Sequence, residues 1–185
     1  MSETPPMPDG EFDLIYADPP WPYTNKADTD GRVEDEYDLM SLEDIMSLDV
    51  PAADDSVLYM WTTAPHARRA FEVIDAWGFE YKTQGVWDKS HPMGIGYWLG
   101  NEHELLYIST KGDYSPPDPS DKHGSIFTEK KRKHSQKPEC VRTYLEQAHP
   151  DARKLEMFAR DGRVGWELWG NETVDEPQSQ LETYV

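Results

Sequence analysis

Short apolar runs recur along this chain, and polar stretches separate them. Each run is bounded by charged residues, glycine or proline, which is the pattern of buried β-strands rather than of long helices. The runs cover residues 12–17, 56–61, 79–87, 105–109, 155–159 and 165–169. None is long enough to span a bilayer. The pattern therefore predicts about six strands, and the last run is the weakest of them.

Two further stretches carry apolar residues at helical spacing. The first has Gly78 at the position where helices often end, and the second follows Pro138, which suits a helix start. Ser41 suits the N-cap of another short helix. The stripes consist of Ala67, Ala70, Phe71, Ile74 and Trp77, and of Val141, Tyr144, Leu145 and Ala148. Strands that alternate with helices predict an α/β fold, a mostly parallel sheet with helices on both faces.

The polar stretches set the expected organisation of the chain. Residues 1–11 contain three prolines and no periodic pattern, so we expect them to be disordered. One domain should cover residues 12–172, and the polar tail 173–185 should be loose. Within the domain, residues 22–40 and 113–136 are predicted loops. A loop as long as the second is commonly functional or disordered.

Composition narrows the class of protein. The 185 residues suit one domain, and the single cysteine, Cys140, excludes an internal disulfide and is best read as a small helix residue. The six histidines show no metal-ligand spacing, so no metal site is predicted. The N-terminus has neither a basic nor an apolar signal region, so we expect a soluble, cytoplasmic protein that does not contact membranes.

A formal net charge of -18 is unusual for a protein that binds nucleic acid. Either the partner is not nucleic acid, or the whole surface is acidic, as in halophilic organisms whose proteins stay solvated in strong salt. Acidic residues are spread along the chain, which favours the second reading. Lys130, Lys131, Arg132 and Lys133 form the one basic cluster. It is either a solvated loop or a contact for phosphates.

Polar and aromatic residues follow several of the predicted strands. In parallel sheets, ligands bind at the carboxyl ends of the strands, so these residues should share one surface. They are Asp18 to Trp21, Thr62, Thr63, Trp87 to Lys89, Arg160, Asn171 and Glu172.

The segment Asp18-Pro19-Pro20-Trp21 is the most distinctive of them. Each proline fixes its own φ and lacks an N–H, and Pro20 also keeps Pro19 out of the α region. The result is a stiff turn that offers a carboxylate and carbonyl oxygens beside a flat indole. Such a turn suits a planar group that carries an NH2, such as adenine.

These residues resemble the MT-A type of N6-adenine methyltransferases, whose signature is DPPW. That family includes the catalytic subunit of the mRNA adenine methyltransferase and many prokaryotic and phage DNA enzymes. Further similar segments follow in the order of the family, from Phe12 to Glu172. They are Tyr59-Met60-Trp61, Trp87-Asp88-Lys89, Gly96-Tyr97-Trp98, Asn101-Glu102-His103-Glu104-Leu105-Leu106, Lys111-Gly112, His134-Ser135-Gln136-Lys137-Pro138, Leu155-Glu156-Met157-Phe158-Ala159-Arg160, Gly165-Trp166 and Trp169-Gly170-Asn171-Glu172.

The resemblance implies a Rossmann-like methyltransferase fold in the permuted order, with the catalytic segment before the cofactor segment. It implies that S-adenosylmethionine is the methyl donor. Asp18 and the Pro19 carbonyl would accept hydrogen bonds from the N6 amine, Pro20 would stiffen the turn, and Trp21 would stack on the base. The cofactor would be bound by Asp18, Ser135, Lys137, Phe158, Arg160, Asn171 and Glu172.

The polymer that carries the adenine stays open between DNA, which we favour, and RNA. A third reading is a catalytically silent partner of an active homologue, although such a subunit has no need for the Asp18 carboxylate. The chain could act alone, as a homodimer or with a partner subunit. Candidate substrate contacts are Tyr23, Lys89, Tyr97, Trp98 and the four basic residues 130–133. Tyr97 and Trp98 fit a stacking platform and a loop anchor equally well.

Overall fold

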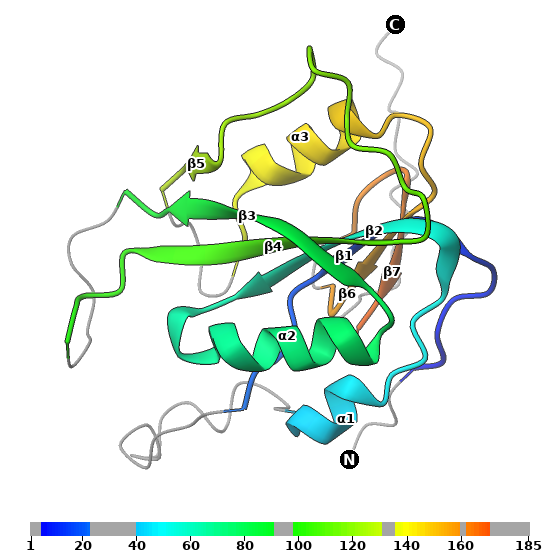
Figure 1. The fold of residues 1–185 in the computed structure, drawn as a ribbon, viewed down its shortest axis with the longest axis horizontal. Helices are drawn as coiled ribbons and strands as arrows, with labels where there is room; N and C mark the ends of the chain where they lie inside the picture. Colours follow the sequence, from blue (N-terminus) through cyan, green and yellow to red (C-terminus); the bar gives the residue numbers. More distant parts are fainter. Residues whose placement is uncertain (1–4, 23–39, 91–97, 131–135, 160–161, 171–185) are drawn as a thin grey trace, which may run out of the picture.

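The computed structural model describes residues 5–22, 40–90, 98–130, 136–159 and 162–170. Its strands form one seven-stranded sheet in the order β5-β3-β4-β2-β1-β6-β7 (Figure 1). The elements are β1 Phe12–Ala17, α1 Leu42–Met46, β2 Ala52–Thr62, the 3-10 turn Ala64–His66, α2 Ala67–Ala76, β3 Glu80–Asp88, β4 His103–Lys111, β5 Ile126–Thr128, α3 Glu139–Ala148, β6 Lys154–Met157 and β7 Trp166–Trp169.

The sheet is mostly parallel, as the sequence predicts. Strands β2, β1, β6 and β7 pair in parallel with one another, and β3 pairs in parallel with β5. Strand β4 is the exception, because it is antiparallel to both β2 and β3. No helix lies between β3 and β4 among the described residues. The first residues of β4 therefore lie at the same edge as the carboxyl ends of its neighbours β2 and β3.

Helices cover both faces of the sheet, which confirms the α/β class (Figure 1). Helices α1 and α2 lie on one face, and α3 lies on the other. Along β1, Ile15 and Ala17 face the core under α1 and α2, whereas Leu14 and Tyr16 face the core under α3. None of the described helices has the length and apolar character needed to cross a membrane.

Local signals in the sequence set the helix boundaries. Ser41 is the N-cap of α1, where its hydroxyl accepts a hydrogen bond from the Asp44 amide at 3.1 Å. Gly78 follows α2 with a φ of 78°, a conformation that a side chain would strain. The predicted apolar stripe is wrong at Phe71, which is 38% exposed and packs edge-on against Tyr81. Val73 is buried instead, so Ala70, Val73 and Ile74 form the buried face of α2.

Two further segments differ from the pattern of the sequence. The predicted loop 113–136 contains a short strand, β5, which pairs with the end of β3. Residues 5–11, for which the sequence predicts disorder, pack against the domain. The Pro5 carbonyl accepts a hydrogen bond from the Trp169 indole at 2.8 Å, and Arg153 donates one to the Asp9 carbonyl at 3.0 Å.

Candidate active site

The carboxyl edge of the sheet brings the ends of three parallel strands together. Ala17, the last residue of β1, pairs with Met60 of β2 and with Met157 of β6. The residues that follow these three are Asp18, Trp61 and Phe158, which therefore lie side by side at this edge. The predicted turn and Phe158, one of the predicted cofactor-binding residues, are thus neighbours in space.

Four charged side chains form one continuous cluster at this edge. The Lys137 ammonium lies 2.8 Å from Asp18 Oδ2 and 3.0 Å from Glu104 Oε2. The other oxygen of Glu104 lies 2.8 Å from the Lys89 ammonium. The order Asp18, Lys137, Glu104, Lys89 alternates in sign and sums to zero charge. Alternation allows all four groups to stay ionised in a site that is largely shielded from water.

The cluster keeps Lys137 and Glu104 in their charged forms. Burial would lower the pKa of Lys137, but the carboxylates of Asp18 and Glu104 outweigh it and keep that pKa above its usual range. Burial would raise the pKa of Glu104, but the ammonium groups of Lys137 and Lys89 outweigh it and keep that pKa below its usual range. The site therefore contains an ammonium ion next to the Asp18 carboxylate over the physiological pH range.

Indole rings line the side of the cluster that faces α3. The Lys137 ammonium lies 5.8 Å from the ring centre of Trp61, and the Lys89 ammonium lies 5.5 Å from that of Trp87. Both distances are within the range of cation–π attraction. The Trp61 indole donates to the Tyr16 hydroxyl at 2.7 Å, and this bond fixes the ring. The aromatic residues of this core thus line the side of the charged cluster that faces α3.

The proline turn is closed by its own backbone. The Trp21 amide donates to the Pro19 carbonyl at 2.9 Å, and the Trp21 indole donates to the Trp61 carbonyl at 3.1 Å. A carbonyl oxygen has two lone pairs, so the Pro19 carbonyl retains capacity for a second donor. The Trp21 ring also stacks on His66, with centroids 5.7 Å apart. The sequence does not predict this partner for the indole.

His66 connects the turn to the segment after β2. Its Nε2 lies 2.8 Å from the Pro22 carbonyl oxygen, and its Nδ1 lies 2.9 Å from the Thr63 hydroxyl. Because a carbonyl only accepts, Nε2 carries the proton and Nδ1 accepts from the hydroxyl. Burial lowers the pKa of His66, and the Pro22 carbonyl opposes this only in part. The neutral imidazole is therefore the form that supports Trp21.

The start of α3 places Lys137. Glu129, which follows β5, accepts hydrogen bonds from the amides of Glu139 and Cys140 at 3.1 and 2.9 Å. A carboxylate at the first turn of a helix satisfies amides that lack partners within the helix and interacts favourably with the helix dipole. The Trp87 indole donates to the Glu129 carbonyl at 2.7 Å. These bonds fix the backbone two residues after Lys137.

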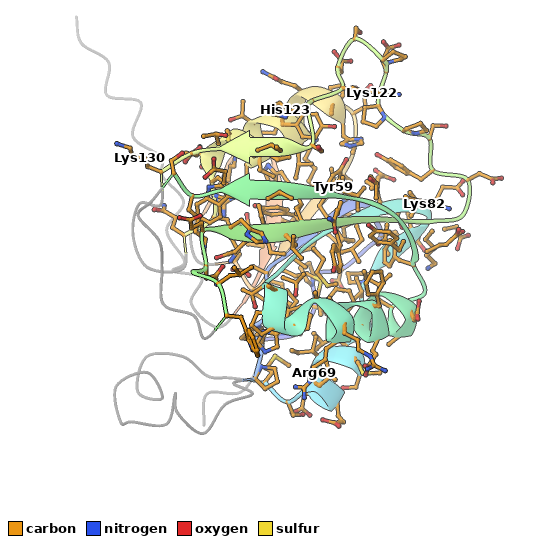
Figure 2. All side chains as sticks on the ribbon, turned by 60° about the vertical axis from the view of Figure 1, so that its left-hand side comes forward. Tyr59, Arg69, Lys82, Lys122, His123 and Lys130 are labelled. Carbon is orange, nitrogen blue, oxygen red and sulfur yellow. The ribbon has the colours of Figure 1, made fainter. Side chains whose placement is uncertain are left out.

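The structure brings some of the predicted site residues together. Asp18, Pro19, Pro20, Trp21 and Lys137 meet at the edge, and Phe158 lies beside them with a φ of 61°, which is rare for a bulky residue. The ammonium of Lys89 lies inside the cluster rather than on the outer rim. Trp98 is 96% exposed, and Lys130 is exposed at the carboxyl edge (Figure 2). Outside the described residues lie Tyr23, Tyr97, Lys131, Arg132, Lys133, Ser135, Arg160, Asn171 and Glu172.

Two residues of the site were not predicted as such. Glu104 lies two positions before Leu106, which faces the core under α3, so strand alternation points its side chain into the same face. An acidic side chain that points toward a core is a signal that could have been used. His66 has no comparable signal, because its contacts with Trp21 and Pro22 join segments that are distant in the sequence. The described residues contain no group of three or more His, Cys, Asp and Glu side chains placed to hold a metal ion.

Comparisons with known proteins bear on the family of this chain. The family model MT-A70 matches residues 12–172. The chain is 34% identical to the Type II methyltransferase M.MunI of a Mycoplasma species over 92% of this chain and 82% of that protein. It is 27% identical to the human N(6)-adenosine-methyltransferase catalytic subunit METTL3, and 28% identical to a probable N(6)-adenosine-methyltransferase of rice. These matches cover 88% of this chain, but only 28% of the human protein and 23% of the rice protein.

Proposed function

The chain belongs to the MT-A70 family, and from this membership we propose that it transfers a methyl group from S-adenosylmethionine to the exocyclic N6 of adenine in DNA. The observation that carries the proposal is the Asp18 carboxylate, held 2.8 Å from Lys137 at the carboxyl edge of the sheet. It follows a buried strand and precedes two prolines, so its position is fixed before any substrate binds.

The chemistry requires acceptors at the amine. The N6 lone pair of adenine is delocalised into the ring, which makes the nitrogen a poor nucleophile. Asp18 and the Pro19 carbonyl accept hydrogen bonds from the two amine hydrogens and thereby favour a tetrahedral nitrogen with a localised lone pair. Trp21 contributes a ring face against the base. Fixed acceptors of this kind lower a barrier by positioning and by electrostatics.

The residues present fit the cofactor. The Lys137 ammonium suits a carboxylate, the Asp18 carboxylate suits a cationic centre, and the ring of Phe158 offers an apolar surface beside them. S-adenosylmethionine, when bound, supplies a methyl group on a cationic sulfur. By the resemblance of the motifs, Ser135, Arg160, Asn171 and Glu172 complete the binding site for this cofactor.

The acceptor polymer is proposed to be DNA. The motif resemblance includes prokaryotic and phage DNA enzymes, and the bacterial relative aligns over most of its own length, unlike the eukaryotic adenosine methyltransferases. If the DNA is a duplex, the target base must leave the stack to reach Asp18. We propose that Trp98 contacts bases at the rim and that Lys130, with the rest of its basic cluster, contacts phosphates.

The test is transfer of a labelled methyl group to adenine-containing oligonucleotides over a range of salt concentrations. We expect transfer to DNA, and hydrolysis of the product to give N6-methyladenine. Transfer to single-stranded RNA in preference to any DNA would favour the RNA alternative, to which the adenosine methyltransferase relatives point. A lack of transfer to every acceptor would contradict the proposal. Asp18→Ala should abolish transfer, which a silent binding subunit would not show.

A further inference from the structure

We propose that Glu104 is a positioning residue, which fixes the Lys137 ammonium against Asp18 while Lys89 fixes Glu104. The inference rests on the proposed methyl transfer and adds two residues to its machinery. Neither Glu104 nor Lys89 has to touch the reacting atoms for this role. Both act through Lys137.

The geometry assigns each oxygen of Glu104 to a different lysine. Oε2 lies 3.0 Å from the Lys137 ammonium, and Oε1 lies 2.8 Å from that of Lys89. The side chain of Glu104 is 13% exposed, that of Lys137 is 13% exposed and that of Lys89 is 11% exposed. Glu104 is thus a shielded bridge between two ammonium groups, and β4 carries it rather than a loop.

The charges show why this bridge matters. Without Glu104, the site would hold two ammonium groups and the Asp18 carboxylate, which leaves an excess positive charge in a shielded place. Such a charge is costly, and the lysines would move apart or one would lose its proton. With Glu104 the cluster is neutral, and the Lys137 ammonium keeps its proton. The bridge therefore decides where Lys137 lies and in which form.

A second anchor also restricts the lysine side chain. Lysine has a flexible stem of four carbons, so an ion pair with Asp18 alone leaves the ammonium free to swing around that carboxylate. Contacts to both Asp18 and Glu104 define one position, above the Trp61 ring at 5.8 Å. Two ion pairs thus hold the ammonium, at 2.8 Å from Asp18 and at 3.0 Å from Glu104.

The position of Lys137 should affect the rate of methyl transfer. A displaced Lys137 would pull the Asp18 carboxylate away from the amine, or leave it without its countercharge. Small misplacements of a catalytic group are expensive in rate, even when the ligands still bind. Glu104 should therefore affect kcat more than the KM for nucleic acid.

The experiment compares Glu104→Gln with Glu80→Gln. Glu80 pairs with Lys82 at 2.9 Å on the exposed part of β3, so its variant makes the same change of charge outside the site. We expect Glu104→Gln to lower kcat by about 10- to 100-fold, with little change in the KM for DNA, and Glu80→Gln to behave as wild type. Glu104→Asp should recover part of the loss.

The protonation of Lys137 provides a readout that does not depend on activity. With labelled lysine, the NMR signal of the Lys137 ε-methylene, assigned with Lys137→Arg, should titrate at lower pH in Glu104→Gln than in the wild type. The groups that face it in the described structure are Asp18, Glu104 and Lys89, together with the Trp61 ring. An unchanged titration with an unchanged kcat would overturn the inference.

A paired variant covers the case in which Glu104→Gln fails to fold. Lys89→Met combined with Glu104→Gln removes one charge of each sign and leaves the Asp18–Lys137 pair in a neutral site. This variant should fold, and it should still lose kcat, because Lys137 has lost its second anchor. Its Lys137 titration should lie closer to that of the wild type than in Glu104→Gln, because the site is neutral. Wild-type kinetics in the paired variant would overturn the inference. If the wild-type chain itself transfers no methyl group, the proposed function fails, and the Lys137 titration still decides the role of Glu104.

Discussion

The indole of Trp21 stacks on the imidazole of His66, with the two ring planes 17° apart. The indole also donates to the Trp61 carbonyl, and the imidazole is bonded to the Pro22 carbonyl and to the Thr63 hydroxyl. The aromatic residue of the DPPW turn is thus fixed on one face before substrate binds. Adenine can be stacked only against surface that His66 does not cover.

We expect His66→Ala to lower the rate of methyl transfer by about 10-fold or more, because the turn loses a ring contact and the bond to Pro22. His66→Phe keeps a ring under Trp21 but loses both hydrogen bonds, so its rate should lie between wild type and His66→Ala. Steady-state transfer assays measure the effect.

The matched control for this prediction is His123→Ala. His123 stacks on Phe127 at 4.3 Å, but it is exposed and belongs to the segment before β5. Its loss should leave the transfer rate unchanged. Equal rates for His66→Ala and wild type would show that methyl transfer does not need the contact between His66 and Trp21.

Much of the fold follows from the sequence, because it depends on apolar runs and helix stripes that are visible in one chain. The sequence does not predict strand β5, because only Phe127 among its three residues is buried. The strand forms through its backbone pairing with β3, which the sequence pattern does not show. Phe71 was assigned to the buried stripe, since helical spacing alone does not tell where a buried face ends. Tertiary contacts with Tyr81 and Tyr107 decide its position.

The sequence likewise predicts only part of the candidate site. Asp18 and Lys137 are identifiable because they belong to motifs with a recognisable order. The neutral four-membered charge cluster is not, because the chain contains 36 acidic residues. Strand alternation can place Glu104 on a buried face, but it does not show which lysines pair with it. His66 has its role through its stacking on Trp21 and its bond to the Pro22 carbonyl, two residues that are distant from it in the sequence. Contacts between distant segments of the chain thus define the part of the site that the sequence alone does not reveal.

Trp98 and Leu99 are 96% and 84% exposed just before β4, at the edge that carries Asp18. If Trp98 stacks on bases, Trp98→Ala should weaken binding of DNA by about 10-fold or more. Fluorescence anisotropy with a labelled oligonucleotide measures the change in Kd. The matched control is Val164→Ala, which removes a side chain that is 99% exposed in the connection between β6 and β7. A similar effect of both substitutions would exclude a specific contact by Trp98.

Lys130 and Lys82 lie toward opposite ends of β3 and its neighbours (Figure 2). A lysine that contacts phosphate releases counterions, so its removal reduces the salt dependence of binding. Lys130→Gln should reduce the slope of log Kd against log salt concentration by about 1, similarly for all DNA sequences. Lys82→Gln makes the same charge change at the far end and should leave the slope as in wild type. Parallel slopes for Lys130→Gln and wild type would contradict a phosphate contact.

His149 lies at the end of α3, where tyrosine hydroxyls engage both of its ring nitrogens. Nε2 lies 2.9 Å from the Tyr59 hydroxyl, and Nδ1 lies 2.9 Å from the Tyr114 hydroxyl. Burial, with a smaller contribution from Lys154, lowers the pKa of His149 to about 4, from 6.5 for an ordinary histidine. Between these pH values the unfolded chain binds a proton that the folded chain does not. The free energy of unfolding therefore falls as the pH is lowered through this window.

We expect His149 alone to account for a loss on the order of 2 kcal/mol between pH 6.5 and 4, after allowance for partial screening by solvent. His149→Gln should be less stable than wild type at pH 7, because the buried Tyr59 hydroxyl and the partly buried Tyr114 hydroxyl lose their bonds to the imidazole. The difference should shrink as the pH falls, since the variant has no imidazole to protonate in the unfolded chain. Urea unfolding at a series of pH values measures both curves.

His103→Gln, which replaces an exposed histidine of β4, is the control. A difference between His149→Gln and wild type that stays constant with pH would show that the imidazole is not held neutral by the fold.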